Sequence, residues 1–217
     1  MAAGVAAGLG AAETVSGDGD EARQRCEVAW VPPPPALTSA LAGALLSDEA
    51  RDAPGSGCED LQVVRYDPGG FYTMHHDSAR EAPRAVTCLY YLNGAGNTWL
   101  PLADARDPPT TRDGALNVAE TLDPKRDGVC TGDVAPGDAL VFFNFDARTG
   151  GPDWTAIHTA LPVDAEKWIA NHWLHVGGIL DVDGRGENMD LLAPGANFEP
   201  QDSVTSRALN GITPATP

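Results

Sequence analysis

The stretch that decides the fold reads Tyr66-Asp67-Pro68-Gly69-Gly70-Phe71-Tyr72-Thr73-Met74-His75-His76-Asp77. Its second half, residues 71–77, is typical of a β-strand, and the two glycines before it permit a tight turn or a bulge. Side chains alternate between the two faces of a strand, so His75 and Asp77 share one face and His76 lies on the other. An imidazole and a carboxylate on the same face form a candidate pair of metal ligands.

Further strand signals surround this stretch and are separated by turns rich in Gly, Pro, Asn and Asp. Together with residues 71–77 they are 61–66, 85–92, 97–100, 139–145, 156–161 and 167–175. Long helical patterns do not intervene, which argues against parallel βαβ units. We therefore expect an all-β core with one flanking helix, arranged as a double-stranded β-helix, or jelly roll.

The rest of the chain predicts one domain with two tails. Residues 1–35 are rich in Ala, Gly and Pro and are expected to be a disordered tail, with residues 32–35 forming a short polyproline spacer. Residues 36–51 predict a helix capped by Thr38 or Ser39. The domain is expected to span residues 36–200, with a long insertion loop at about 102–133 and a C-terminal tail at 201–217.

Charge excludes some classes of partner. The 217 residues carry 31 acidic and 14 basic side chains, a net charge of −17. Nucleic-acid surfaces are basic and anionic membranes attract cations, so neither is an expected partner. The N-terminal residues lack a basic segment, and we find no run long enough to span a membrane, which favours a cytoplasmic location.

The four cysteines do not predict a metal site. Cys26, Cys58, Cys88 and Cys130 are widely separated and show no Cys-x-x-Cys spacing. We expect free thiols rather than disulfides.

Three segments resemble the prolyl 4-hydroxylase family of Fe(II)/2-oxoglutarate-dependent dioxygenases. Residues 66–77 are similar to the family pattern Tyr-x-x-Gly-x-x-Tyr-x-x-His-x-Asp. Residues 91–101 are similar to the strand and Gly-x-Thr turn that follow it. Residues 136–173 contain Pro136-Gly137, His158, Pro162-Val163 and Lys167-Trp168-Ile169-Ala170-Asn171-His172-Trp173, which resemble the end of the family's core.

The resemblance implies a chemistry and a set of residues. Iron(II) would be held by His75, Asp77 and His158, the 2-His-1-carboxylate arrangement of non-haem oxygenases. The cosubstrate 2-oxoglutarate would contact Lys167, Tyr66 and Thr98. With O2, and ascorbate as the accompanying reductant, the enzyme would hydroxylate a prolyl residue in a peptide or protein and form succinate and CO2.

Strand alternation favours His158 over two other late histidines as the third ligand. If Lys167 faces the interior, His172 faces away from it, and His175 shares its face but lies far along the strand. Tyr72 and Trp154 are the candidate substrate contacts. Two alternatives remain open: the same chemistry on another amino-acid residue or a small metabolite, and a non-catalytic jelly-roll binding module.

Overall fold

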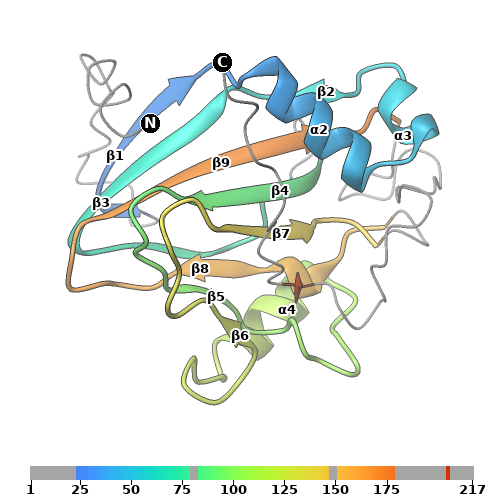
Figure 1. Cartoon of the computed structure of the whole chain (residues 1–217). Helices are drawn as coiled ribbons and strands as arrows, with labels where there is room; N and C mark the ends of the chain where they lie inside the picture. Colours follow the sequence, from blue (N-terminus) through green and yellow to red (C-terminus); the bar gives the residue numbers. More distant parts are fainter. Residues whose placement is uncertain (1–22, 79–82, 147–150, 179–203, 206–217) are drawn as a thin grey trace.

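The computed structural model describes residues 23–78, 83–146, 151–178 and 204–205. Figure 1 shows a curled sheet with helices at its margins. Its elements are β1 (Arg23–Val31), α2 (Pro35–Leu45), α3 (Asp48–Asp52), β2 (Gly57–Cys58), β3 (Leu61–His75), β4 (Arg84–Tyr91), β5 (Thr98–Leu100), α4 (Arg112–Ala119), β6 (Val129–Cys130), β7 (Ala139–Phe143), η1 (Trp154–Ala156), β8 (His158–Ala160), β9 (Lys167–His175) and β10 (Val204–Thr205).

The long strand β3 pairs with a different strand along each of its two halves. Its first half pairs with β9 and places Tyr66 opposite Lys167. Its second half pairs with β8 and places His75 opposite His158. Between the halves, Gly69 adopts a φ of +79°, a conformation that residues with a Cβ rarely take. The pairing of β3 with β1 is irregular here, between Tyr66 and Phe71, where the sequence predicts a turn or a bulge.

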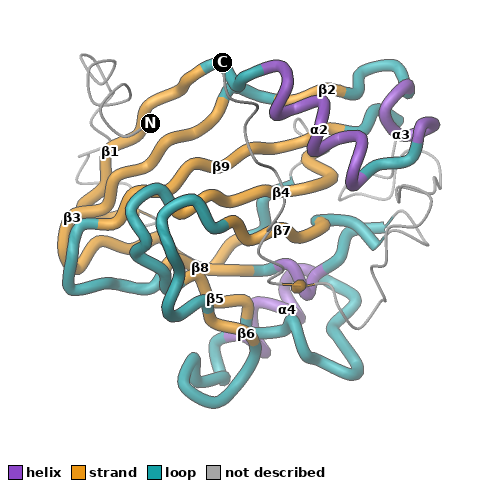
Figure 2. The backbone as a smooth tube through the Cα atoms, viewed as in Figure 1, coloured by secondary structure: helices purple, strands orange, loops and turns teal. Residues whose placement is uncertain are grey.

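The strands follow the order β10-β7-β4-β9-β3-β8-β5-β6, with β1 added to β3 and β2 added to β9. The pairings between the described strands are antiparallel, and the sheet curls on itself (Figure 2). This topology confirms the prediction of an all-β jelly roll.

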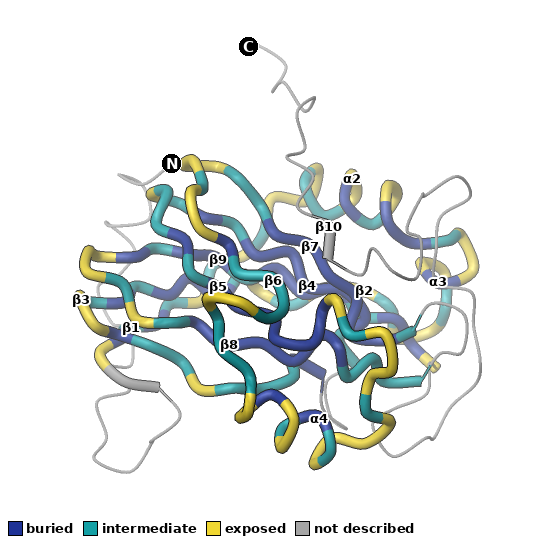
Figure 3. Tube along the Cα trace, turned by 90° about the horizontal axis from the view of Figure 1, so that it is seen from below, coloured by how far each residue is buried: buried dark blue, intermediate teal, exposed yellow. Residues whose placement is uncertain are grey.

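The core lies on both sides of the central strands. On β4, Leu89 and Tyr91 point inward into a cluster that also receives Val64 and Tyr66 of β3 and Phe142 of β7. The alternating positions point outward, where they form a second apolar cluster with the helices α2 and α3; this cluster includes Leu41, Leu45, Val86, Cys88, Val141, Phe143 and Leu174. Burial on both faces explains the continuous run of buried residues along β4 and β7 (Figure 3).

The predicted helix over residues 36–51 is two helices. The first, α2, ends before Leu46, which has an extended conformation, and α3 begins after Ser47. The predicted caps Thr38 and Ser39 are wrong, because Pro34 is the N-cap residue of α2 and no side chain caps that end. Ser47 caps α3 by accepting a hydrogen bond from the amide of Ala50.

The predicted N-terminal tail is wrong in its last part. Residues 23–31 form β1, which pairs with β3 from Arg23↔Tyr72 to Val31↔Leu61. Its sequence alternates, and Cys26 and Val28 are buried in the core, which is the reason that this segment is a strand. Residues 1–22 lie outside the described part of the chain.

The predicted insertion loop and C-terminal tail also contain structure. Residues 102–133 include α4, capped by Thr111, and β6, which pairs with β5. Ala115 and Ala119 are fully buried, so α4 is attached to the domain by its own apolar face. Within 201–217, Val204 and Thr205 pair with β7, and the other residues of that tail lie outside the described part.

Two further properties follow from the described residues. None of their helices combines the length and apolar character needed to cross a bilayer. No disulfide joins the four cysteines, of which Cys58 is exposed and Cys88 is buried.

Candidate metal centre

Three side chains that the sequence singles out meet at the junction of β3 and β8. One potential ligand atom from each of His75, Asp77 and His158 lies within 4.8 Å of the others. The two histidines are opposite one another in the antiparallel pair, and Asp77 follows the end of β3. His75 Nε2 lies 3.5 Å from Asp77 Oδ1, and His158 Nε2 lies 3.8 Å from Asp77 Oδ2.

Hydrogen bonds to the backbone fix the orientation of both imidazoles. His75 Nδ1 contacts the carbonyl of Thr73 at 2.8 Å, and His158 Nδ1 contacts the carbonyl of Ala156 at 2.9 Å. A carbonyl only accepts, so each Nδ1 carries the proton and each Nε2 keeps its lone pair available to a metal ion on the side that faces Asp77. Burial and the nearby His75 lower the pKa of His158 to about 4, which keeps this imidazole neutral.

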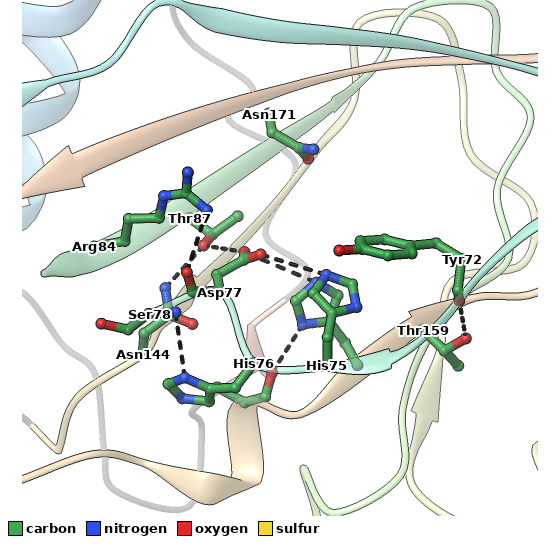
Figure 4. Close-up of polar contacts among 12 residues, drawn as sticks. Tyr72, His75, His76, Asp77, Ser78, Arg84, Thr87, Asn144, Thr159 and Asn171 are labelled. Carbon is green, nitrogen blue, oxygen red and sulfur yellow. Dashed lines mark hydrogen bonds and ion pairs between the residues drawn. The ribbon is translucent and has the colours of Figure 1, made fainter. Parts of the chain in front are cut away.

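Asp77 is a buried carboxylate that remains ionised. Burial alone would raise its pKa, but His158, His75 and the hydroxyl of Thr87 outweigh burial and hold the pKa far below its usual range. Oδ2 accepts hydrogen bonds from the Thr87 hydroxyl at 2.6 Å and from the Trp173 indole at 3.1 Å. Figure 4 shows the carboxylate of Asp77 between Thr87 and the imidazole of His75. Two neutral imidazoles and one carboxylate suit Fe(II) and leave coordination positions open.

Lys167 is the second unusual polar group in the interior. Its side chain is 1% exposed, and Nζ has no hydrogen-bond partner among the described residues. Burial lowers its pKa to about 8. Nζ lies 5.7 Å from the ring centre of Tyr66 and 6.0 Å from that of Tyr91. A buried amine without a hydrogen-bonding partner is costly, so its surroundings suit an anionic ligand.

The third predicted cosubstrate residue, Thr98, belongs to a hydrogen-bonded group beside this lysine. The Tyr91 hydroxyl donates to Thr98 Oγ1 at 2.9 Å and contacts Thr131 Oγ1 at 2.8 Å. Tyr91 and Thr131 are not among the cosubstrate residues predicted from the sequence. Tyr91 has the same parity as Leu89 on β4, so strand alternation was the available signal that it points inward.

The two candidate substrate residues occupy different places. The ring of Tyr72 is 3.9 Å from that of His75, at the metal-ligand cluster (Figure 4). The ring of Trp154 is 5.1 Å from that of His76 and packs against Leu102, Ala115 and Ile157. The structure therefore brings Tyr72, but not Trp154, against a proposed ligand.

His76 connects the two segments that carry the candidate ligands. Its Nε2 contacts the carbonyl of Asp153 at 3.1 Å, and its Nδ1 accepts a hydrogen bond from the amide of Ser78 at 3.3 Å. Asp153 is the N-cap residue of η1, the turn that leads into β8 and His158. The neighbour of the metal-ligand pair thus ties the end of β3 to the start of β8.

The two other late histidines lie elsewhere, as strand alternation predicts. His172 is fully buried, and its Nε2 lies 3.1 Å from Thr38 Oγ1 beneath α2. His175 Nε2 lies 2.7 Å from Glu59 Oε1. Neither belongs to the cluster of His75, Asp77 and His158.

A comparison with protein families matches residues 61–175, slightly more than half of the chain, to the model described as the 2OG-Fe(II) oxygenase superfamily. The matched segment begins with β3 and ends with β9, so it contains the complete candidate centre.

Two curated relatives are prolyl 4-hydroxylases by name. The chain is 32% identical over 138 residues to a putative prolyl 4-hydroxylase of Acanthamoeba polyphaga mimivirus, covering 56% of this chain and 47% of that protein. It is 36% identical over 147 residues to prolyl 4-hydroxylase 2 of Arabidopsis thaliana, covering 60% and 47%. The chain thus spans about half the length of these relatives.

Among solved structures, the chain is similar to the viral collagen prolyl hydroxylase of Paramecium Bursaria Chlorella virus-1. The TM-score is 0.48 at 21% identity, and the match covers 70% of this chain and 79% of that one.

Proposed function

Because this chain belongs to the 2OG-Fe(II) oxygenase superfamily, we propose that it is an Fe(II)- and 2-oxoglutarate-dependent dioxygenase that hydroxylates a prolyl residue in a peptide or protein. The observation that carries the proposal is the cluster of His75, Asp77 and His158, in which both Nε2 atoms are turned toward one ionised carboxylate. Iron held by these three side chains would supply the activation of O2 that couples decarboxylation of 2-oxoglutarate to hydroxylation of the substrate.

In this proposal, Lys167 binds the carboxylate of 2-oxoglutarate that does not react. The buried Nζ lacks a hydrogen-bond partner among the described residues, and a carboxylate would provide one with the opposite charge. Tyr66, which lies opposite Lys167 in the β3–β9 pair, and Thr98 flank the same end of the cosubstrate. Tyr91, whose hydroxyl already donates to Thr98, joins them as a residue that the structure adds.

The acceptor is proposed to be proline because named relatives are prolyl 4-hydroxylases. Tyr72, whose ring lies against His75, is the proposed wall of the pocket for the reacting residue. The role of Trp154 stays a prediction: its ring lies 5.1 Å from that of His76 and packs against the apolar cluster under α4.

The test is turnover on matched peptides. The protein is supplied with Fe(II), 2-oxoglutarate, O2 and ascorbate, together with proline-rich peptides or the same peptides with each proline replaced by alanine. We expect succinate and a peptide heavier by one oxygen atom only when proline is present, and neither product with Asp77→Ala. Succinate formation that ignores every peptide and responds instead to a free amino acid or metabolite would contradict the proposed acceptor.

A further inference from the structure

Trp30 is a large apolar side chain left exposed on the inner face of β1. Cys26, Val28 and Trp30 have the same parity and therefore share one face of this strand. Cys26 and Val28 are each 7% exposed and belong to the core, whereas Trp30 is 51% exposed. Among the described residues, Trp30 and Val118 are the exposed large hydrophobic side chains. The inward-facing row of β1 thus continues beyond the end of the core and emerges into solvent.

One side chain, Trp173, links the exposed indole of Trp30 to the candidate metal centre. Its ring is 6.0 Å from that of Trp173, and the indole nitrogen of Trp173 lies 3.1 Å from Asp77 Oδ2. Trp30 is opposite Gln62 in the β1–β3 pair, and Gln62 accepts a hydrogen bond from Asn171 at 3.1 Å. A row of side chains therefore leads from Trp30 across the sheet toward the metal-ligand cluster.

The surface beside Trp30 offers an aromatic ring and little net charge. The guanidinium of Arg84 stacks over Trp173, with its carbon atom 3.6 Å from the ring centre. Its charge is neutralised by Glu59, which accepts two hydrogen bonds from it at 2.6 and 2.8 Å. An exposed ring next to a compensated charge fits an apolar, uncharged segment of peptide better than an acidic or basic one.

We propose that Trp30 is a peptide-binding residue, against which a proline or another apolar residue of the substrate stacks a few positions away from the residue that reacts. The inference rests on the proposed function, because it assigns a second contact for the same peptide. A polyproline II segment advances about 3.1 Å per residue, so the 6.0 Å between the rings of Trp30 and Trp173 corresponds to about two residues. Such a segment is already stiff and loses little entropy when it binds an aromatic surface.

The chain's own prolines do not compete for this role in the described structure. Residues 32–35 connect β1 to α2, with Pro34 as the N-cap residue and Pro35 as the first residue of the helix. The run is therefore used as the connection between two elements. The occupant of the Trp30 surface is a separate peptide.

The experiment compares Trp30→Ala and Trp30→Phe with Val118→Ala, which removes the other exposed large hydrophobic side chain on α4. Affinity for a fluorescent proline-rich decapeptide is measured without O2 on protein loaded with Fe(II) and 2-oxoglutarate. Turnover is then measured on the decapeptide and on a tripeptide with one proline.

We expect Trp30→Ala to weaken decapeptide binding about 10-fold, equivalent to about 1.4 kcal/mol, and to raise the KM for the decapeptide with little change in kcat. Tripeptide turnover and the KM for 2-oxoglutarate should stay the same, and Trp30→Phe and Val118→Ala should resemble the wild type.

The outcomes separate this inference from the proposed function. Wild-type hydroxylation of the decapeptide with unchanged binding by Trp30→Ala overturns the role of Trp30 and leaves the enzyme assignment intact. Decapeptide binding that is lost in Trp30→Ala, without hydroxylation in the wild type, supports the peptide surface and overturns the reaction. A wild-type protein that neither binds nor hydroxylates the decapeptide overturns both.

Discussion

At the scale of single residues, the carboxylate of Asp77 is oriented by groups that do not belong to the proposed ligand set. Thr87 and Trp173 both donate to Oδ2, and Asn144 Nδ2 in turn donates to Thr87 Oγ1 at 2.9 Å. Thr87 and Asn144 are fully buried. Contacts of this kind hold a ligand in its binding orientation before the metal arrives, which reduces the cost of ordering it.

We expect Thr87→Val, which keeps the shape of the side chain and removes the hydroxyl, to weaken Fe(II) binding about 10- to 100-fold. The variant should also lose about 1–3 kcal/mol of unfolding free energy, because Asn144 Nδ2 loses its acceptor. Anaerobic titration with Fe(II) measures the first effect, and urea denaturation measures the second. Thr87→Ser retains the hydroxyl and should bind metal like the wild type. Equal affinity in Thr87→Val and Thr87→Ser would show that this hydroxyl does not position Asp77.

The lowered pKa of Lys167 predicts a pH dependence for 2-oxoglutarate binding. Burial brings the pKa to about 8 from its ordinary value of 10.5. Below about pH 8 the amine is charged and ready to pair with a carboxylate; above it, the free protein must take up a proton to form that pair. The Kd for 2-oxoglutarate, measured with Fe(II) bound and without O2, should therefore rise from pH 7 to pH 9.5. Lys167→Arg keeps its charge over this range and should give a flat profile, whereas a flat wild-type profile would contradict the role of Lys167.

At the scale of elements, substitutions in β1 measure how much this strand contributes to the stability of the domain. We expect Val28→Ala to cost about 1–3 kcal/mol of unfolding free energy, because Val28 is buried in the core that β1 shares with β3. Glu27→Ala is the matched control on the other face: Glu27 pairs with Arg65 at 3.3 Å near the surface, and its loss should cost less than about 1 kcal/mol. Urea denaturation distinguishes the two. If both substitutions were neutral, β1 would behave as the tail that the sequence predicts.

The elements that the sequence predicted well are those whose pattern matches their burial. The prediction for residues 167–175 coincides with β9, and its alternation correctly separates Lys167 from His172. The predictions were wrong where the overall composition of a segment outweighed the alternation of its apolar residues. β1 follows a segment rich in Ala, Gly and acidic residues, although Cys26, Val28 and Trp30 already alternate within it. Gly69-Gly70 suggested a break, yet the strand continues through the bend at Gly69.

The candidate centre shows the same division. Strand alternation predicted that His75 and Asp77 share a face, and the family resemblance added His158 as the third ligand. The structure brings the three side chains together. The sequence could not identify Thr87 and Asn144 as supports for Asp77, because their contacts depend on the registers of β4 and β7 in the sheet. Register is set by long-range pairing and cannot be read from one segment at a time.

At the scale of the whole molecule, the two faces of β4, β7 and β9 differ in what they contact. The outward face of β4, β7 and β9 is covered by α2 and α3 and contributes to stability. The inward face carries the metal-ligand cluster, Lys167 and the core between them. This separation places the polar groups of the candidate centre inside the curl of the sheet, while the helices cover its outside (Figure 1).

The pairing of β3 with β8 also bears on how the chain reaches its native state. His75 and His158 face each other only in one register, since a slip of one residue would turn His158 to the opposite face. The same pairing joins Tyr72 to Thr159 across 87 positions of sequence, and long-range contacts of this kind slow folding. A metal ion bound by both histidines would therefore stabilise the sheet with the correct register and not a sheet in which β8 is shifted by one residue. The ion that serves the reaction would thus also select the correctly assembled sheet.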